Sequence, residues 1–134
     1  MSELRADTIT GSDGTSPVTL TKQSAAKAWI NFNGTGTITA RGSLNLSTLV
    51  DNGQGDYTVN FTNAFGAADY TVSGTASGNA DAIRGYTGFM AADANNAPTA
   101  SALRTKFGLG STGSANGQLY DGVYNTILNH GDLA

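Results

Sequence analysis

The stretch that decides the fold is residues 51–61, Asp51-Asn52-Gly53-Gln54-Gly55-Asp56-Tyr57-Thr58-Val59-Asn60-Phe61. Its first half is the strongest hairpin signal in the chain, because asparagine and glycine tolerate the positive backbone φ angles of tight turns. After the turn, apolar and polar residues alternate, which places Tyr57, Val59 and Phe61 on one face of a strand. The stretch therefore predicts an antiparallel hairpin whose second strand buries these three side chains.

Alternation of the same kind recurs along the rest of the chain. In residues 28–33 it places Ala28, Ile30 and Phe32 on the face opposite Trp29. Further strands are predicted at residues 37–41, 44–50, 69–74, 83–90, 103–109 and 123–128. Strand centres roughly 8 to 12 residues apart are typical of antiparallel sandwiches. We therefore expect an all-β fold, an antiparallel β-sandwich of about seven or eight strands, over residues 28–134.

The composition agrees with one β-rich domain and excludes several classes of partner. The 134 residues include 18 glycines, 13% charged residues and no cysteine, and Glu and Lys, which favour long exposed helices, are scarce. The net charge is −3 and the basic residues are scattered singly, so no cationic stripe is available to neutralise phosphates. No apolar run is long enough to span a bilayer. We expect neither nucleic acid as a partner nor insertion into a membrane.

Residues 1–27 differ from the rest of the chain and are predicted to form an extended docking arm. Their large apolar side chains, Leu4, Ile9, Val18 and Leu20, are too widely spaced to form a core. Two extended pieces joined by a glycine-rich turn fit the intervening sequence. The last residues of the arm have the propensity for one or two helical turns, which is too short to be stable alone. We expect the four apolar side chains to dock on another protein.

Two segments without strand periodicity, residues 91–100 and 108–117, are predicted to be loops. Loops at the edge of a rigid scaffold are where binding residues concentrate. Short hydrogen-bonding side chains suited to sugar hydroxyls make these loops the predicted receptor contact; they are Asn95, Asn96, Ser111, Thr112 and Asn116. Aromatic side chains that could stack on sugars, or pack within the domain or between subunits, are Trp29, Tyr86, Tyr120 and Tyr124.

Two short motifs suggest ligand sites but have simpler explanations. Residues 108–113 match the G-x-G-x-x-G pattern of dinucleotide-binding loops, yet the residues that follow cannot start a helix, so a flexible turn is favoured. Residues 51–56 offer oxygen ligands of the kind that calcium prefers, but they lack the downstream glutamate of an EF-hand. A hairpin in which Asp51 and Asn52 accept backbone hydrogen bonds explains the same residues.

Catalysis is disfavoured by the scarcity of suitable groups. His130 is the single histidine, no G-x-S-x-G elbow occurs, and most aspartates fall in predicted turns. The enzymatic alternative that stays open is a pair of aspartates meeting in a pocket, as in a glycosidase. We therefore predict no enzyme activity, no cofactor and no metal.

Three stretches share a pattern with a known family: Ala26-Lys27-Ala28-Trp29-Ile30-Asn31-Phe32-Asn33-Gly34-Thr35-Gly36-Thr37-Ile38, then Ser43-Leu44-Asn45-Leu46-Ser47, and residues 51–61 quoted above. Together they resemble a recurring module of tailed-phage virion proteins, namely tail fibres and small capsid-surface proteins of marine and cyanobacterial phages. Residues 4–10 and 14–18 are similar to the start of such fibre proteins. The resemblance covers residues 1–75 and, loosely, 123–128, and it does not extend to residues 80–117.

The resemblance implies a homotrimeric, non-enzymatic virion component, either a capsid-decoration protein or a short tail fibre. The arm would dock on the capsid or tail, and the sandwich would reinforce the shell or attach to the host. Expected partners are further copies of the chain, other virion proteins and a host-surface glycan. We expect synthesis in the host cytoplasm, since Met1 leads into polar sequence, and a final location on the virion surface. The alternative is a carbohydrate-binding module at the tip of a receptor-binding fibre.

Overall fold

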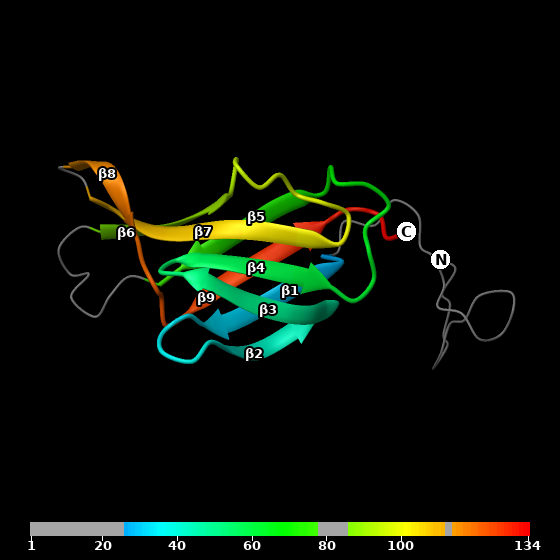
Figure 1. The fold of residues 1–134 in the computed structure, drawn as a ribbon, viewed down its shortest axis with the longest axis horizontal. Helices are drawn as coiled ribbons and strands as arrows, with labels where there is room; N and C mark the ends of the chain where they lie inside the picture. The colour runs from blue at the N-terminus through cyan, green and yellow to red at the C-terminus, as the bar shows by residue number, and fades with distance from the viewer. Residues whose placement is uncertain (1–25, 78–85, 112–113) are drawn as a thin grey trace, which may run out of the picture.

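The computed structural model describes residues 26–77, 86–111 and 114–134, and within them the chain forms two antiparallel sheets (Figure 1). The predicted arm lies outside the described residues except for Ala26 and Lys27, which are not helical. The described part contains nine strands and no helix, so the expectation of an all-β sandwich is confirmed. No helix in the described ranges is long and apolar enough to cross a membrane.

The first sheet has four strands. Their order across the sheet is β2 (Thr39–Leu44), β1 (Ala28–Asn33), β9 (Asn125–His130) and β5 (Thr71–Ala76). Trp29 in β1 lies opposite Leu44 in β2 and opposite Leu128 in β9. Side chains of directly opposed residues point to the same face of a sheet, so the register aligns these three side chains across neighbouring strands.

The second sheet has five strands. Its order is β3 (Leu46–Gly53), β4 (Asp56–Phe61), β7 (Ala102–Ser111) and β6 (Tyr86–Ala92), with β8 (Ser114–Leu119) also paired to β7. Lys106 in β7 lies opposite Asp56 in β4, and Arg104 lies opposite Thr58. This pairing joins residues about fifty positions apart in the chain and creates the polar cluster described below.

The two sheets are joined at one edge by a single residue, Asn45, which separates β2 from β3. Its φ of +57° lies in the left-handed region, which asparagine adopts more readily than most side chains. The Asn45 amide holds the corner in place: Asn63 N donates to Oδ1 at 2.7 Å, and Nδ2 donates to the Asn63 carbonyl at 3.0 Å. The chain therefore passes from one sheet to the other without a loop.

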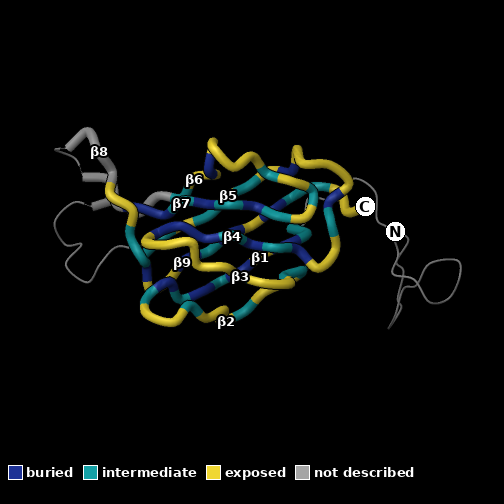
Figure 2. The backbone as a smooth tube through the Cα atoms, viewed as in Figure 1, coloured by how far each residue is buried: buried dark blue, intermediate teal, exposed yellow. Residues whose placement is uncertain are grey.

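The core lies between the sheets and follows the predicted alternation. Ala28, Ile30 and Phe32 are buried on β1, as are Tyr57, Val59 and Phe61 on β4, which confirms both predicted core faces. The buried hydrophobic side chains are completed by Phe65, Tyr70, Leu103, Phe107 and Ile127. In Figure 2 the buried positions run along the central strands, and exposed positions gather on β2, β3 and the loops.

Aromatic rings fill both ends of the core with edge-to-face contacts. The Phe32 ring lies 4.9 Å from the Tyr57 ring and 5.6 Å from the Phe107 ring, centroid to centroid. At the other end the Phe61 ring packs edge-on against Phe65 at 5.0 Å. Such geometry adds about 0.5–1.5 kcal/mol per pair to the burial of the rings. These contacts explain how a chain so rich in glycine maintains a dense interior.

The predicted hairpin between β3 and β4 is confirmed. Gly53 and Gly55 have φ values of +130° and +63°, which non-glycine residues rarely adopt. Gly53 N donates to Asp51 Oδ1 at 2.9 Å, as expected for a capped turn. Asn52 was expected to accept backbone hydrogen bonds, but its side-chain amide instead donates to Thr58 Oγ1 at 2.8 Å.

One predicted loop is wrong. Residues 108–111 form the end of β7, and residues 114–117 belong to β8; Thr112 and Gly113 lie outside the described residues. Glycine has low strand propensity, but β7 here pairs with both β6 and β8, so its backbone hydrogen bonds override the local preference. A strand follows the G-x-G-x-x-G motif where a dinucleotide-binding loop would require a helix. Of the other predicted loop, residues 91–100, the first two residues belong to the end of β6, and residues 93–100 form the expected irregular connection.

Candidate functional site

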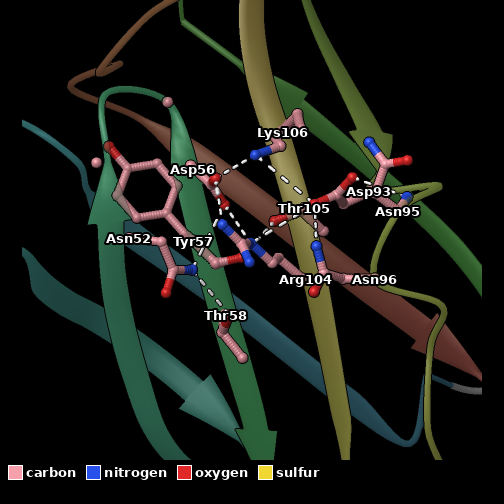
Figure 3. A network of polar contacts seen from close by, with 12 residues as sticks. Asn52, Asp56, Tyr57, Thr58, Asp93, Asn95, Asn96, Arg104, Thr105 and Lys106 are labelled. Carbon is pink, nitrogen blue, oxygen red and sulfur yellow. Dashed lines mark hydrogen bonds and ion pairs between the residues drawn. The ribbon is translucent and has the colours of Figure 1, made fainter.

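A cluster of four charged side chains lies on the outer face of the five-stranded sheet (Figure 3). Asp56 begins β4, Arg104 and Lys106 lie two residues apart on β7, and Asp93 follows the end of β6. Their neighbours in β4 and β7 point into the core, so strand alternation directs the charged side chains outward. The cluster therefore combines two carboxylates and two cations from three segments of the chain.

Asp56 is the centre of this charged cluster. Arg104 donates to both of its oxygens, from Nε to Oδ1 at 2.9 Å and from an Nη to Oδ2 at 2.8 Å. Lys106 Nζ also donates to Oδ2. The Asp56 side chain is only 8% exposed, whereas those of Arg104 and Lys106 are 30% and 27% exposed. The two cations thus cover the carboxylate from solvent, and the bidentate contact made by Arg104 is among the stronger ion-pair arrangements.

Asp93 is held by its own turn as well as by the cations. Asn95 N donates to its Oδ1 at 3.1 Å, and Asn96 Nδ2 donates to its Oδ2 at 2.7 Å. Asp93 Oδ2 lies 3.6 Å from Arg104 Nε and 3.7 Å from Lys106 Nζ. Asn96, a predicted receptor contact, therefore has its amide engaged in ordering this turn.

Electrostatics keep both carboxylates ionised. The hydrogen bond from Arg104, supported by Lys106, holds the pKa of Asp56 well below its usual range despite the opposing effect of burial. The hydrogen bond from Asn96, followed by that from the Asn95 backbone, lowers the pKa of Asp93. A general acid needs a raised pKa so that it carries a proton near neutral pH. This pair of aspartates is therefore suited to cross-linking strands and unsuited to proton transfer.

A second polar contact ties the hairpin to the segment before β9. The Tyr57 hydroxyl donates to Asp121 Oδ1 at 2.6 Å and lies 3.1 Å from the Gly34 carbonyl oxygen. Gly55 N donates to the same Asp121 oxygen at 2.6 Å. Burial, reinforced by Asp121, raises the pKa of the Tyr57 hydroxyl far above its usual value. Because this hydroxyl stays protonated and committed to its acceptors, it serves as a structural clamp.

A pocket of about 430 Å³ lies beside Tyr70 and brings two further aspartates to one concavity. Its lining consists of Phe65, Gly66, Ala67, Asp69, Tyr70, Gly131 and Asp132. Both Asp69 and Asp132 are exposed, and the Tyr70 hydroxyl donates to the Ala102 carbonyl at 3.1 Å. Two aspartates thus contribute to the lining of one pocket, and the Tyr70 hydroxyl beside them is already engaged by a backbone carbonyl. Within the described ranges, no three acidic or histidine side chains group as metal ligands.

The outer face of the four-stranded sheet is of the opposite character. Leu44, Trp29 and Leu128 form a line across three neighbouring strands and are 48%, 39% and 36% exposed. We call this line the apolar row. The Trp29 ring packs over Gly42, where an added Cβ would lie 3.3 Å from the ring. Beside the row, the Thr75 and Thr126 hydroxyls are hydrogen-bonded to each other at 2.7 Å.

The structure separates the two segments that were predicted to share a receptor contact. Asn95 and Asn96 lie in the turn after β6, which is tied to β7 by the hydrogen bond from Asp93 N to the Arg104 carbonyl. Ser111 is the last residue of β7, seven positions beyond Arg104, or roughly 23 Å along a strand. Asn116 lies in β8 near that far end, and the side chains of Ser111 and Asn116 are not described. Asn95 and Asn96 therefore do not form one continuous site with Ser111 and Asn116.

Several other predicted site residues lie outside the described part of the chain; they are Leu4, Ile9, Val18, Leu20 and Thr112. Among the candidate aromatics, Trp29 and Tyr124 are exposed and Tyr120 is half-buried, while the Tyr86 side chain is not described. Arg41 lies over the Tyr124 ring at 4.4 Å from its centroid, a cation–π contact.

Sequence reasoning missed the charged cluster and the Asp121 clamp. The spacing of Arg104 and Lys106, two residues apart in a predicted strand, places both on one face and would have indicated a cationic pair. Their acidic partners could not be assigned, because the pairing of β4 with β7 is set by the register of distant strands. Comparison with family models, characterised proteins and solved structures gives no match.

Proposed function

We propose that the protein is a phage virion structural protein, a trimeric capsid-decoration or short-fibre protein that docks through its N-terminal arm. The observation that carries the proposal is the apolar row, Leu44, Trp29 and Leu128, whose exposed side chains are aligned across three neighbouring strands. A contiguous apolar patch on a folded domain marks a surface that another protein covers. The resemblance of residues 26–61 to phage virion modules supplies the kind of assembly in which such a domain would be found.

The chemistry of the charged cluster supports a structural role over a catalytic one. Asp56 and Asp93 are ionised and paired, and the Tyr57 hydroxyl is committed to Asp121. These groups tie strands together across the sheet. A cysteine-free, glycine-rich domain gains further stability when copies associate, because binding of folded subunits shifts the folding equilibrium toward the native state. Closed symmetric assembly is the usual form of such association.

Incorporation into purified particles tests this proposal. Deleting residues 2–20 should abolish incorporation, because the docking side chains are removed, while circular dichroism still shows a folded β-domain. The full-length Val50→Ser variant, which alters an exposed apolar residue of the head, is the matched control and should incorporate normally. A truncated protein present at full occupancy would mean that the arm is not the docking element. Absence of the unmodified protein from purified particles would overturn the virion role itself.

A carbohydrate-binding module is the second candidate, and the Trp29 ring favours it. This ring is exposed on a flat sheet face beside the Thr75 and Thr126 hydroxyls, an arrangement suited to stacking against a sugar. Single-site affinity would be weak, and attachment would depend on many copies acting together. Glycan arrays probed with multivalent particles test the idea: binding that is lost in Trp29→Ala supports attachment to the host, and an array without hits leaves reinforcement of the shell.

A further inference from the structure

The apolar row is an exposed surface that a segment of the same protein could cover. Its three side chains come from β2, β1 and β9 and are held in line by the register of the sheet. The Trp29 ring lies over Gly42, where the absence of a side chain leaves room for the ring to lie along the sheet. Leu44, at one end, is nearly half exposed. A covering segment therefore needs two or more apolar side chains spaced to reach along a line of neighbouring strands.

The N-terminal arm supplies such a segment. Val18, Thr19 and Leu20 alternate, so an extended backbone would present Val18 and Leu20 on one side. Those two side chains would lie about 7 Å apart, which falls within the roughly 10 Å that three neighbouring strands span between Leu44 and Leu128. The arm also joins the described chain at the right place, because Ala26 is only three residues before Trp29.

The sequence of the connection favours a neighbouring copy over the same chain. Residues 21–27, Thr21-Lys22-Gln23-Ser24-Ala25-Ala26-Lys27, contain no glycine, proline, asparagine or aspartate. Tight reversals of the backbone depend mainly on these residue types, and serine forms turns more weakly, so Ser24 is the one turn-forming residue of the connection and a return to its own Trp29 is disfavoured. Fully extended, seven residues span about 23 Å. A compact domain with a radius of gyration of about 13 Å is roughly 34 Å across, so this connection reaches beyond the edge of its own head and toward an adjoining one.

We propose that Val18 and Leu20 of one copy cover the apolar row, Leu44, Trp29 and Leu128, of a neighbouring copy. The arms thereby exchange between subunits and hold the oligomer together. The inference rests on the oligomeric assembly proposed above and names its interface. It predicts that the row is buried in the assembled protein and becomes accessible when the arm is altered.

Trp29 is the single tryptophan of the chain, so its fluorescence reports on the apolar row directly. In the full-length protein its emission should be blue-shifted and protected from acrylamide quenching. The full-length double variant Val18→Ser/Leu20→Ser should shift the emission to the red and increase quenching. Leu4→Ser/Ile9→Ser, which makes the same chemical change elsewhere in the arm, is the matched control and should leave Trp29 unaffected.

Mixing two full-length variants distinguishes a neighbouring arm from the chain's own arm. Val18→Ser/Leu20→Ser retains Trp29 but has a disabled arm, whereas Trp29→Phe has an intact arm and no tryptophan signal. The two are denatured together, refolded together and compared with each variant refolded alone. A blue shift of the Trp29 emission in the mixture, growing with the proportion of Trp29→Phe chain, is the expected result.

Three outcomes would overturn the inference. Trp29 emission that is unaltered in Val18→Ser/Leu20→Ser means that the arm does not cover the row. If Trp29 is then protected from quenching only at high protein concentration, the heads pack directly on one another. Red-shifted emission that is not rescued in the mixture means that each arm covers its own head. These measurements use purified protein, so exchange of arms without incorporation into particles would contradict the virion role alone. Incorporation without protection of Trp29 would contradict the exchange alone.

Discussion

The two outer faces of the sandwich are built from similar strands and have opposite chemistry. On the five-stranded sheet, Asp56 is enclosed by Arg104 and Lys106, and the Asn60 amide donates to Thr48 Oγ1 at 2.8 Å. On the four-stranded sheet, the apolar row remains exposed. Although Val50 is exposed on the charged face, the polar groups of that face satisfy one another within the chain, and such a face suits contact with water. A face that exposes aligned apolar side chains has a lower free energy when another surface covers it.

Core substitutions should lower the free energy of unfolding the most, and substitutions on the two outer faces are compared with them. Phe61→Ala should lower the free energy of unfolding by about 3–5 kcal/mol, because Phe61 is buried against Phe65. Tyr57→Ala and Val59→Ala should also destabilise strongly. Thr58→Ala and Asn60→Ala, whose side chains point outward from the same strand, should cost much less. Equal losses for the two sets in urea titrations would show that β4 is not a half-buried strand.

Removing the centre of the charged cluster should have the next largest effect. Asp56→Asn keeps the size of the side chain but leaves Arg104 and Lys106 without their ionised acceptor, and should cost about 1–3 kcal/mol. The cost is limited because both cations are partly exposed and can bind water. Asp69→Asn, at an exposed aspartate, is the control and should change the thermal midpoint little. A loss no greater than that of the control would mean that the ion pairs do not stabilise the face.

The same cluster predicts a pH dependence. Because ion pairing holds the pKa of Asp56 below its unfolded value, the folded protein binds fewer protons at this site than the unfolded chain. The stabilisation is complete above about pH 5 and is lost as the pH falls below about 4. Urea unfolding of the unmodified protein should therefore weaken more steeply on acidification than that of Asp56→Asn. Parallel curves for the two proteins would contradict the assignment.

The apolar face should be almost insensitive to substitution as far as the folding of one head is concerned. Leu44→Ser removes a side chain that is nearly half exposed, so the free energy of unfolding measured on dilute protein should change by no more than about 0.5 kcal/mol. In sedimentation equilibrium the oligomer of the same variant should already be dissociated at protein concentrations at which the unmodified protein is still assembled, because the substitution weakens the interface. Val50→Ser, on the other sheet, is the control and should leave the mass of the oligomer unaltered.

The sequence predicted local features of this fold better than long-range ones. The alternation of Tyr57, Val59 and Phe61 identified the core face of β4, and the glycines of residues 51–55 identified the hairpin. Residues 108–111 were misassigned because their strand state depends on pairing with β6 and β8. The contact of Arg104 with Asp56 likewise depends on strand register, which composition does not reveal. Asn95 lies in a turn that is tied to β7 at Arg104, whereas Ser111 is the last residue of β7. Their separation depends on this tertiary contact and could not be predicted from the sequence.

A density map of the intact particle tests the central claim most directly. The sandwich should be found on the particle surface in threefold sets, with each apolar row covered at a subunit contact and the charged face of the five-stranded sheet turned to solvent. Particles without the protein would contradict the virion role. Particles that carry it with Trp29 exposed would show that the apolar face is not a subunit contact.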